Sequence, residues 1–226
     1  MRFSVPDAGE VQAILLRPKS AECVLTLAHG AGAGMNHPFM TALAYKLADA
    51  GVATFRFQFP YMEQRRRVPD RPAVLTATVE AAVQAASKAA PDLPLFSGGK
   101  SFGGRMTSLA AAEGRLDGVR CLVFFGFPLH PPNRPGTKRA EHLSKVKLPM
   151  LFLQGTRDAL ADLQLLRPIC DELGARATLH VIEGADHSFH VLKSSGKTDD
   201  GVLEELAKKA SAWTKEIVKA FHSPLD

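Results

Sequence analysis

Residues 93-LPLFSGGKSFGGRMTSLAAAE-113 carry the most informative pattern in this chain, because two motifs overlap in them. Gly99-Lys100-Ser101 ends like a phosphate-binding P-loop, whereas Gly99-x-Ser101-x-Gly103 is typical of a sharp turn that presents a nucleophilic serine. The P-loop pattern needs another glycine at position 94, where this chain has Pro94, which has no N–H group for a phosphate. We therefore favour the serine motif.

The neighbouring residues supply the context that the serine motif requires. The run 93-LPLF leads into the turn as a strand, and 104-GRMTSLAAAE leads out of it as a helix. Small residues on both sides of the serine permit the strained backbone and the close approach of the helix. Ser101 is therefore the candidate nucleophile.

Strands and helices alternate along most of the chain. We expect strands in residues 11–18, 23–30, 52–59, 93–99, 119–127, 149–155 and 177–184, and helices in 38–50, 73–90, 102–113, 160–173 and from 202 onward. This alternation predicts an α/β fold with a mostly parallel central sheet and helices on both faces. Residues 2–5 and 11–17 flank a turn-rich segment and predict an antiparallel hairpin at the N-terminus.

Composition and charge place the chain in a broad class. A length of 226 residues, 46% of them hydrophobic, predicts one domain over residues 1–226. A net charge of +5 is too modest to indicate nucleic-acid binding, and three scattered cysteines do not form a disulfide or metal pattern. Without an N-terminal signal or an apolar run of roughly 20 residues, we expect no membrane contact and a cytoplasmic location.

A serine nucleophile needs a general base and an acid that orients it. In this class of fold the acid and then the histidine follow the serine, each just after a later strand. Asp158 in 154-QGTRD and His187 in 183-EGADH meet both conditions. Asp186 competes as the acid, but it directly precedes His187 and would have difficulty turning back onto that ring, so we favour Asp158.

An oxyanion hole is expected from the backbone N–H of Phe102 and that of Ala31 in the glycine-rich loop 28-AHGAGAGMN, with Gly32 as the next candidate donor. His29 opens this loop and is expected to hold it by hydrogen bonding. Lys100 either raises the positive potential near the oxyanion or points outward. The candidate residues of a substrate cleft are His29, Gly32, Lys100, Tyr61 and His130. No cofactor and no metal ion are expected.

The motifs LAHGAGAGMNHPFM, FRFQFPYME, GGKSFGGRM and GADHSF resemble those of the α/β-hydrolase superfamily, over nearly the whole chain. More narrowly, they resemble a short hydrolase-like family typified by the testis-expressed hydrolase-like proteins, and more distantly the dienelactone hydrolases. The resemblance implies a compact core without a large cap and a Ser101–Asp158–His187 triad. It leaves the substrate open, and a related chromatin-complex subunit serves as a scaffold.

The expected function is metal-independent hydrolysis of an ester, thioester or related acyl substrate through an acyl-enzyme on Ser101. About twenty residues between 119–127 and Pro149 are too few for a helical lid, which predicts an open site. Basic residues Arg65, Arg66, Arg67 and Arg71, with Arg134, Lys138 and Arg139, either attract an anionic substrate or partner or are merely a solvated surface, which we favour. The alternative function is a non-catalytic interaction scaffold. The oligomeric state stays open.

Overall fold

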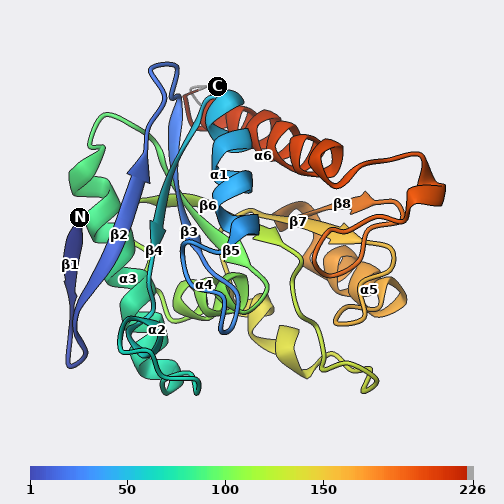
Figure 1. Cartoon of the computed structure of the whole chain (residues 1–226), viewed down its shortest axis with the longest axis horizontal. Coiled ribbons are helices and arrows are strands. Elements are labelled where there is room, and N and C mark those ends of the chain that lie inside the picture. The colour runs from blue at the N-terminus through green and yellow to red at the C-terminus, as the bar shows by residue number, and fades with distance from the viewer. Residues whose placement is uncertain (223–226) are drawn as a thin grey trace.

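A computed structural model describes residues 1–222, with the backbone alone for residues 221 and 222. Its centre is an eight-stranded sheet in the order β1-β2-β4-β3-β5-β6-β7-β8 (Figure 1). The strands are β1 (Arg2–Val5), β2 (Gly9–Leu16), β3 (Cys23–Ala28), β4 (Val52–Phe57), β5 (Leu95–Lys100), β6 (Val119–Phe125), β7 (Met150–Gly155) and β8 (Ala177–Ile182). Strands β3 to β8 are mutually parallel, while β2 runs antiparallel to β1 and β4. The expected mostly parallel sheet and N-terminal hairpin are confirmed.

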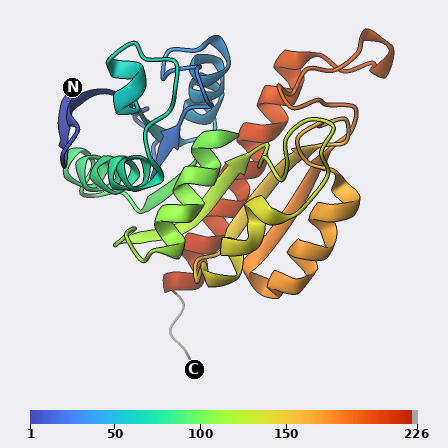
Figure 2. The ribbon, with the colours of Figure 1, turned by 90° about the horizontal axis from the view of Figure 1, so that it is seen from below.

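Two helical layers cover the two faces of the sheet (Figure 2). One face carries α3 (Pro72–Ala89), α4 (Phe102–Ala112) and α5 (Leu163–Leu173), and the other carries α1 (Pro38–Asp49) and α6 (Asp199–His222). Successive strand residues point to opposite faces, so Phe124 packs in the first layer while Val123 and Phe125 pack in the second. Burial on both faces explains why the central strands are almost continuously apolar.

The connection between β6 and β7 carries one short 3-10 helix, η1 (Lys138–Lys145), and no larger helical insertion. The expected absence of a large cap is therefore confirmed. Another 3-10 helix, η2 (Gly174–Arg176), links α5 to β8, and a third, η3 (Lys193–Ser195), precedes α6. The edge of the sheet where β5, β7 and β8 end is thus not covered by an inserted domain.

Two segments differ from what the sequence pattern predicts. The helix expected from residue 160 begins at Leu163, because the Asp162 side chain accepts a 2.8 Å hydrogen bond from the Gln164 N–H and caps it there. The stretch 60–72, rich in proline and arginine, includes a short helix, α2 (Pro60–Glu63), whose Tyr61 is completely buried. Part of that stretch therefore belongs to the core.

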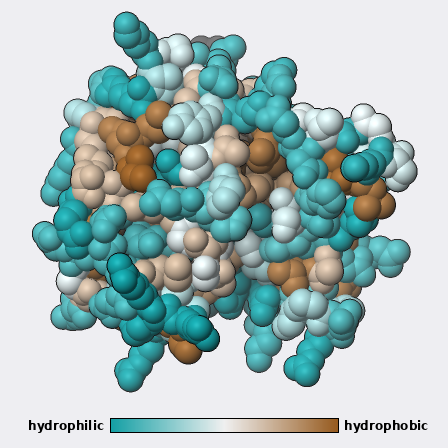
Figure 3. Space-filling model, viewed as in Figure 1, coloured by the Kyte–Doolittle hydropathy of each residue, from teal (hydrophilic) through white to brown (hydrophobic). Residues whose placement is uncertain are grey.

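On the face shown in Figure 3, hydrophobic side chains gather in a few small groups, the clearest at the upper left, and polar side chains separate these groups. Across residues 1–222, no helix combines the length and the apolar character that crossing a bilayer requires.

Candidate active site

Ser101 lies at the sharp turn between β5 and α4 and has a strained backbone. Its φ of 51° and ψ of −118° are unfavourable for a residue with a side chain, at roughly 1–3 kcal/mol. Hydrogen bonds on both sides hold the turn: the Ser101 N–H donates to the Phe125 carbonyl at 3.1 Å, and the Arg105 N–H donates to the Ser101 carbonyl at 3.1 Å. The serine is therefore presented by a rigid frame.

Glycines beside Ser101 allow α4 to pack directly onto the end of β3. A Cβ atom on Gly103 would lie 2.4 Å from the Ala28 carbonyl oxygen, and one on Gly99 would lie 2.6 Å from the same oxygen. Side-chain carbons do not tolerate such distances, so glycine is required at both positions. The close contact brings the loop after β3 beside Ser101, where a Cβ on Gly30 would be 4.0 Å from the Ser101 Cβ.

Three side chains from distant parts of the chain form a continuous hydrogen-bonded series. Ser101 Oγ lies 2.8 Å from His187 Nε2, and His187 Nδ1 lies 2.7 and 2.9 Å from the two carboxylate oxygens of Asp158. Asp158 follows β7 and His187 follows β8, so parallel strands bring both to the edge where β5 ends. Because Nδ1 donates to the carboxylate, Nε2 is free to accept the serine proton.

Exposure differs sharply along this series. The Asp158 side chain is 1% exposed, whereas that of His187 is 23% exposed. The carboxylate is thus shielded from water, and the imidazole reaches the surface where a substrate could arrive. A buried carboxylate needs further hydrogen bonds to stay ionised.

Those further bonds come from Gln154 and Leu160. Gln154 Nε2 donates to Asp158 Oδ2 at 2.5 Å, and the Leu160 N–H donates to Asp158 Oδ1 at 2.8 Å. Gln154 is itself held, because its Oε1 accepts a 2.9 Å bond from the Phe127 N–H. We did not anticipate Gln154 from the sequence, although a lone polar residue in the apolar strand 149-PMLFLQG was a usable signal.

Asp186, the competing acid, has a different role in the structure. Its Oδ1 accepts hydrogen bonds from the Ser188 N–H at 2.8 Å and the His190 N–H at 3.0 Å. Asp186 therefore shapes the loop that carries His187, while Asp158 bonds to the imidazole. The carboxylate that we favoured from the sequence, Asp158, is thus the one that contacts the imidazole.

Tyr61 and His29 hold the loop after β3 through hydrogen bonds. The Tyr61 hydroxyl accepts a 3.0 Å hydrogen bond from the Gly32 N–H. Gly32 therefore does not offer a free N–H in this conformation, which leaves Ala31 as the candidate donor from this loop, alongside Phe102 at the start of α4. Ala31 is exposed, as a group that meets a substrate should be.

His29 is fully buried, which corrects our expectation that it lines a cleft. Its Nε2 accepts from the Phe59 N–H at 3.2 Å, so its Nδ1 carries the proton and donates to the Gly30 carbonyl at 2.8 Å. Burial lowers the pKa of His29 to about 4, and the ring is neutral at pH 7. His29 holds the loop, as we expected of its hydrogen bonding.

Tyr61 and His130 are corrected in the same way, because both are buried. His130 Nδ1 lies 2.9 Å from the Pro131 carbonyl, and its Nε2 accepts a 3.0 Å bond from the Asp162 N–H. It thus ties the loop after β6 to the loop after β7. Of the five cleft candidates, Gly32 alone is exposed.

Lys100 does not point outward. Its side chain is buried, and its Nζ donates a 2.6 Å hydrogen bond to the backbone carbonyl of His187. Lys100 is therefore also removed from the list of cleft residues.

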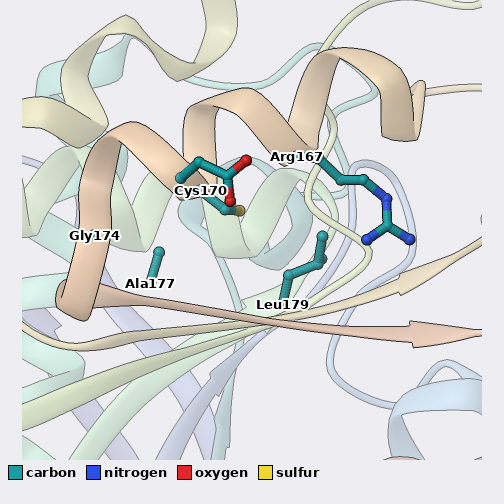
Figure 4. A pocket seen from close by; sticks show the side chains of 6 residues that line it. Arg167, Cys170, Gly174, Ala177 and Leu179 are labelled. Carbon is teal, nitrogen blue, oxygen red and sulfur yellow. The ribbon is translucent and has the colours of Figure 1, made fainter.

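A separate cavity lies away from these groups. Figure 4 shows Arg167 and Cys170 of α5 standing over Ala177 and Leu179, which belong to β8. The space has a volume of about 520 Å³, and none of Ser101, Asp158 and His187 lines it. It is an open groove at the edge of the sheet.

One family model and two relatives match most of this chain. The sequence model of the family described as "Alpha/beta hydrolase domain" matches residues 21–215. Two Mycobacterium tuberculosis proteins, each named "Putative phosphoribosyl transferase", are 28% identical over 215 residues, which is 92% of this chain. The chain spans 43% of the length of these relatives.

Solved structures agree on the fold. A dienelactone hydrolase from Anabaena variabilis superposes with a TM-score of 0.74 at 23% identity, covering 96% of this chain and 95% of the other. A serine hydrolase without a lid from Xanthomonas campestris gives a TM-score of 0.71 at 21% identity over 93% of both chains. Est1E from Butyrivibrio proteoclasticus with bound ferulic acid gives 0.72 at 18% identity, covering 97% and 99%.

Proposed function

We propose that this chain, which belongs to the alpha/beta hydrolase domain family, is a metal-independent serine hydrolase of esters, thioesters or related acyl compounds. The observation that carries the proposal is the series in which Ser101 Oγ lies 2.8 Å from His187 Nε2 while Asp158 holds His187 Nδ1. A serine hydroxyl is a weak nucleophile unless a base takes its proton, and this arrangement supplies that base in the correct orientation.

In the first half of the reaction, Ser101 Oγ attacks the acyl carbon and His187 Nε2 takes the hydroxyl proton. Asp158 stabilises the imidazolium that forms and keeps its Nδ1–H directed at the carboxylate. The carbonyl oxygen becomes negatively charged and would be held by the N–H groups of Phe102 and Ala31. His187 then returns its proton to the leaving group, which departs and leaves an acyl group on Ser101.

In the second half, water attacks the acyl carbon and gives a proton to His187. The same two N–H groups would hold the oxyanion again. When the bond to Ser101 Oγ breaks, His187 protonates that oxygen and the acid is released. The cycle restores every protein group and needs no cofactor.

We also propose two narrower assignments, one of subfamily and one of activity. The motifs GGKSFGGRM and GADHSF support the narrower likeness to the short testis-expressed hydrolase-like proteins and a carboxylesterase-like activity. The small-molecule substrate would approach an edge without a large cap. Arg65, Arg66 and Arg67 are exposed, and Arg66 pairs with Asp70. We therefore favour a solvated basic surface over attraction of an anionic substrate.

A fluorophosphonate probe tests the proposal directly, because it reacts covalently with an activated serine. The parent protein should label, Ser101→Ala should not, and His187→Ala should label at least about 100-fold more slowly. Ser108→Ala is a matched control, since Ser108 lies buried in α4, the helix that Ser101 precedes, and outside the series. A folded parent protein that never labels would favour the alternative, a non-catalytic scaffold.

A panel of esters then resolves the substrate class. Esters graded by acyl length and by charge should show turnover that depends on Ser101. Charge reversal at Arg65, Arg66 and Arg67 should lower kcat/KM for anionic esters more than for neutral ones if these arginines attract the substrate. An unchanged ranking of the two groups of esters would remove the anionic substrate from the proposal.

A further inference from the structure

Lys100 is a buried cation that the proposed mechanism does not use. It is 9% exposed and directly precedes Ser101. A lysine buried to this degree is rare, because leaving water destabilises its charge. Its surroundings therefore indicate what the charge does.

Three groups hold the Lys100 ammonium in place. Nζ donates at 2.6 Å to the His187 carbonyl oxygen, and it lies 5.7 Å from the ring centre of Phe39 and 5.4 Å from that of Phe189. The two rings are stacked on each other with centroids 5.8 Å apart. Cation–π contacts and a charged hydrogen bond thus fix the ammonium against the loop that carries His187.

The ammonium also lies close to the acid and the base. The position that a Cβ on Gly126 would take is 3.1 Å from Lys100 Nζ, 3.6 Å from Asp158 Oδ2 and 3.6 Å from His187 Cε1. The ammonium, the carboxylate and the imidazole therefore all lie beside the same position at Gly126. Gly126 has a φ of 72° and no side chain, which leaves that space open.

The charged groups that face Lys100 come from two loops. Asp158 follows β7, and Asp186 and His187 follow β8, while α1 contributes the ring of Phe39. Burial lowers the pKa of Lys100 to about 8, and attraction to Asp158 and Asp186 acts against that shift. At neutral pH the side chain is therefore mostly charged.

We propose that Lys100 is a positioning residue that anchors the His187 loop and so keeps His187 Nε2 directed at the Ser101 hydroxyl. The hydrogen bond to the His187 carbonyl fixes the same residue whose Nε2 faces Ser101. This inference rests on the proposed function for its catalytic meaning, but the anchoring of the loop concerns the folded protein alone.

The direct test is an NMR spectrum, recorded at pH 7, of histidines carrying ¹³C at Cε1, with the His187 signal assigned by its loss in His187→Gln. In Lys100→Met the His187 signal should broaden or split, because the loop no longer holds the imidazole in one position. Lys100→Arg keeps a charged donor and should retain the single parent signal. His142, which bonds to Ser108 instead, should not change and serves as an internal reference.

Lys100→Gln provides a second neutral variant if Lys100→Met does not fold. A His187 signal as sharp and single as in the parent, in either folded neutral variant, would overturn the proposal. The rate of fluorophosphonate labelling at pH 7 is the second readout: it should fall by about tenfold in the neutral variants and recover in Lys100→Arg. If the parent protein does not label, the hydrolase proposal fails while the NMR spectrum still decides the role of Lys100.

Discussion

Gln154 Nε2 and Asp158 Oδ2 are joined by a 2.5 Å hydrogen bond inside the protein, where Gln154 is fully buried and the Asp158 side chain is 1% exposed. The amide thus bonds to the same carboxylate oxygen that lies 2.7 Å from His187 Nδ1. It also links β7 to the loop after β6, since Gln154 Oε1 accepts from the Phe127 N–H. The orientation of Asp158 therefore depends on a residue that never meets the substrate.

Gln154→Leu should weaken both function and stability. The substitution removes one hydrogen bond from Asp158 and leaves the buried Phe127 N–H without its partner, at about 1–3 kcal/mol of unfolding free energy. Fluorophosphonate labelling should slow by about tenfold, since the acid is less firmly oriented. Chemical denaturation and labelling kinetics check the two effects. Parent-like values in both assays would show that Gln154 does not support Asp158.

Gly103→Ala should damage the turn at Ser101. A Cβ there would stand 2.4 Å from the Ala28 carbonyl oxygen, so α4 must move away from β3, with a loss of stability of about 1–3 kcal/mol or more. Labelling of Ser101 should fall with it. Gly136→Ala is the matched control, because a Cβ at Gly136 meets nothing within 4 Å and should leave both measurements unchanged.

Tyr61→Phe should loosen the loop that presents Ala31. The change removes the hydroxyl that accepts the Gly32 N–H at 3.0 Å and leaves the ring packing in place. We expect a stability loss of about 1 kcal/mol and a larger effect on kcat than on KM, since a mobile loop holds the oxyanion less well. An effect confined to KM would indicate that this loop binds the ground-state substrate instead.

The stability of the protein should fall with acid between pH 6.5 and about 4. Burial lowers the pKa of His29 and of His142 from 6.5 to about 4 in the folded state. In this pH window the unfolded chain binds protons that the folded chain does not, so each ring reduces stability by up to about 3 kcal/mol as the pH falls. Urea denaturation across the window measures the slope, and His142→Gln should make it shallower.

The stability of Lys100→Met relative to the parent protein should depend on pH. Because folding lowers the Lys100 pKa from 10.5 to about 8, the charged form is penalised below pH 8, and the penalty fades between pH 8 and 10.5. The stability of the variant minus that of the parent should therefore be about 1–3 kcal/mol more favourable at pH 7 than at pH 10.5. Urea denaturation at the two pH values measures this difference, and an unchanged difference would contradict the prediction.

The sequence pattern was sufficient to predict the architecture and to propose the three side chains that follow strand ends. The alternation of apolar runs and helices predicted the parallel sheet, and the turn-rich segment after Val5 predicted the hairpin. Ser101, Asp158 and His187 could be proposed in advance because each lies in the turn or loop after a strand, and parallel strands end at one edge. The boundary at Leu163 was missed because it depends on the cap formed by Asp162.

The residues that line a substrate cleft could not be predicted correctly from the sequence alone. Residue type and order along the chain, which a sequence contains, predicted the candidate nucleophile, its order with the candidate acid and base, and the glycines that the turn needs. The directions of side chains were decided by packing in three dimensions, which buries His29, Tyr61, Lys100 and His130 and assigns Asp158 rather than Asp186 to the imidazole. The physical reason is that burial and hydrogen-bond partners depend on segments far apart in the chain, as the bond between Lys100 and His187 does.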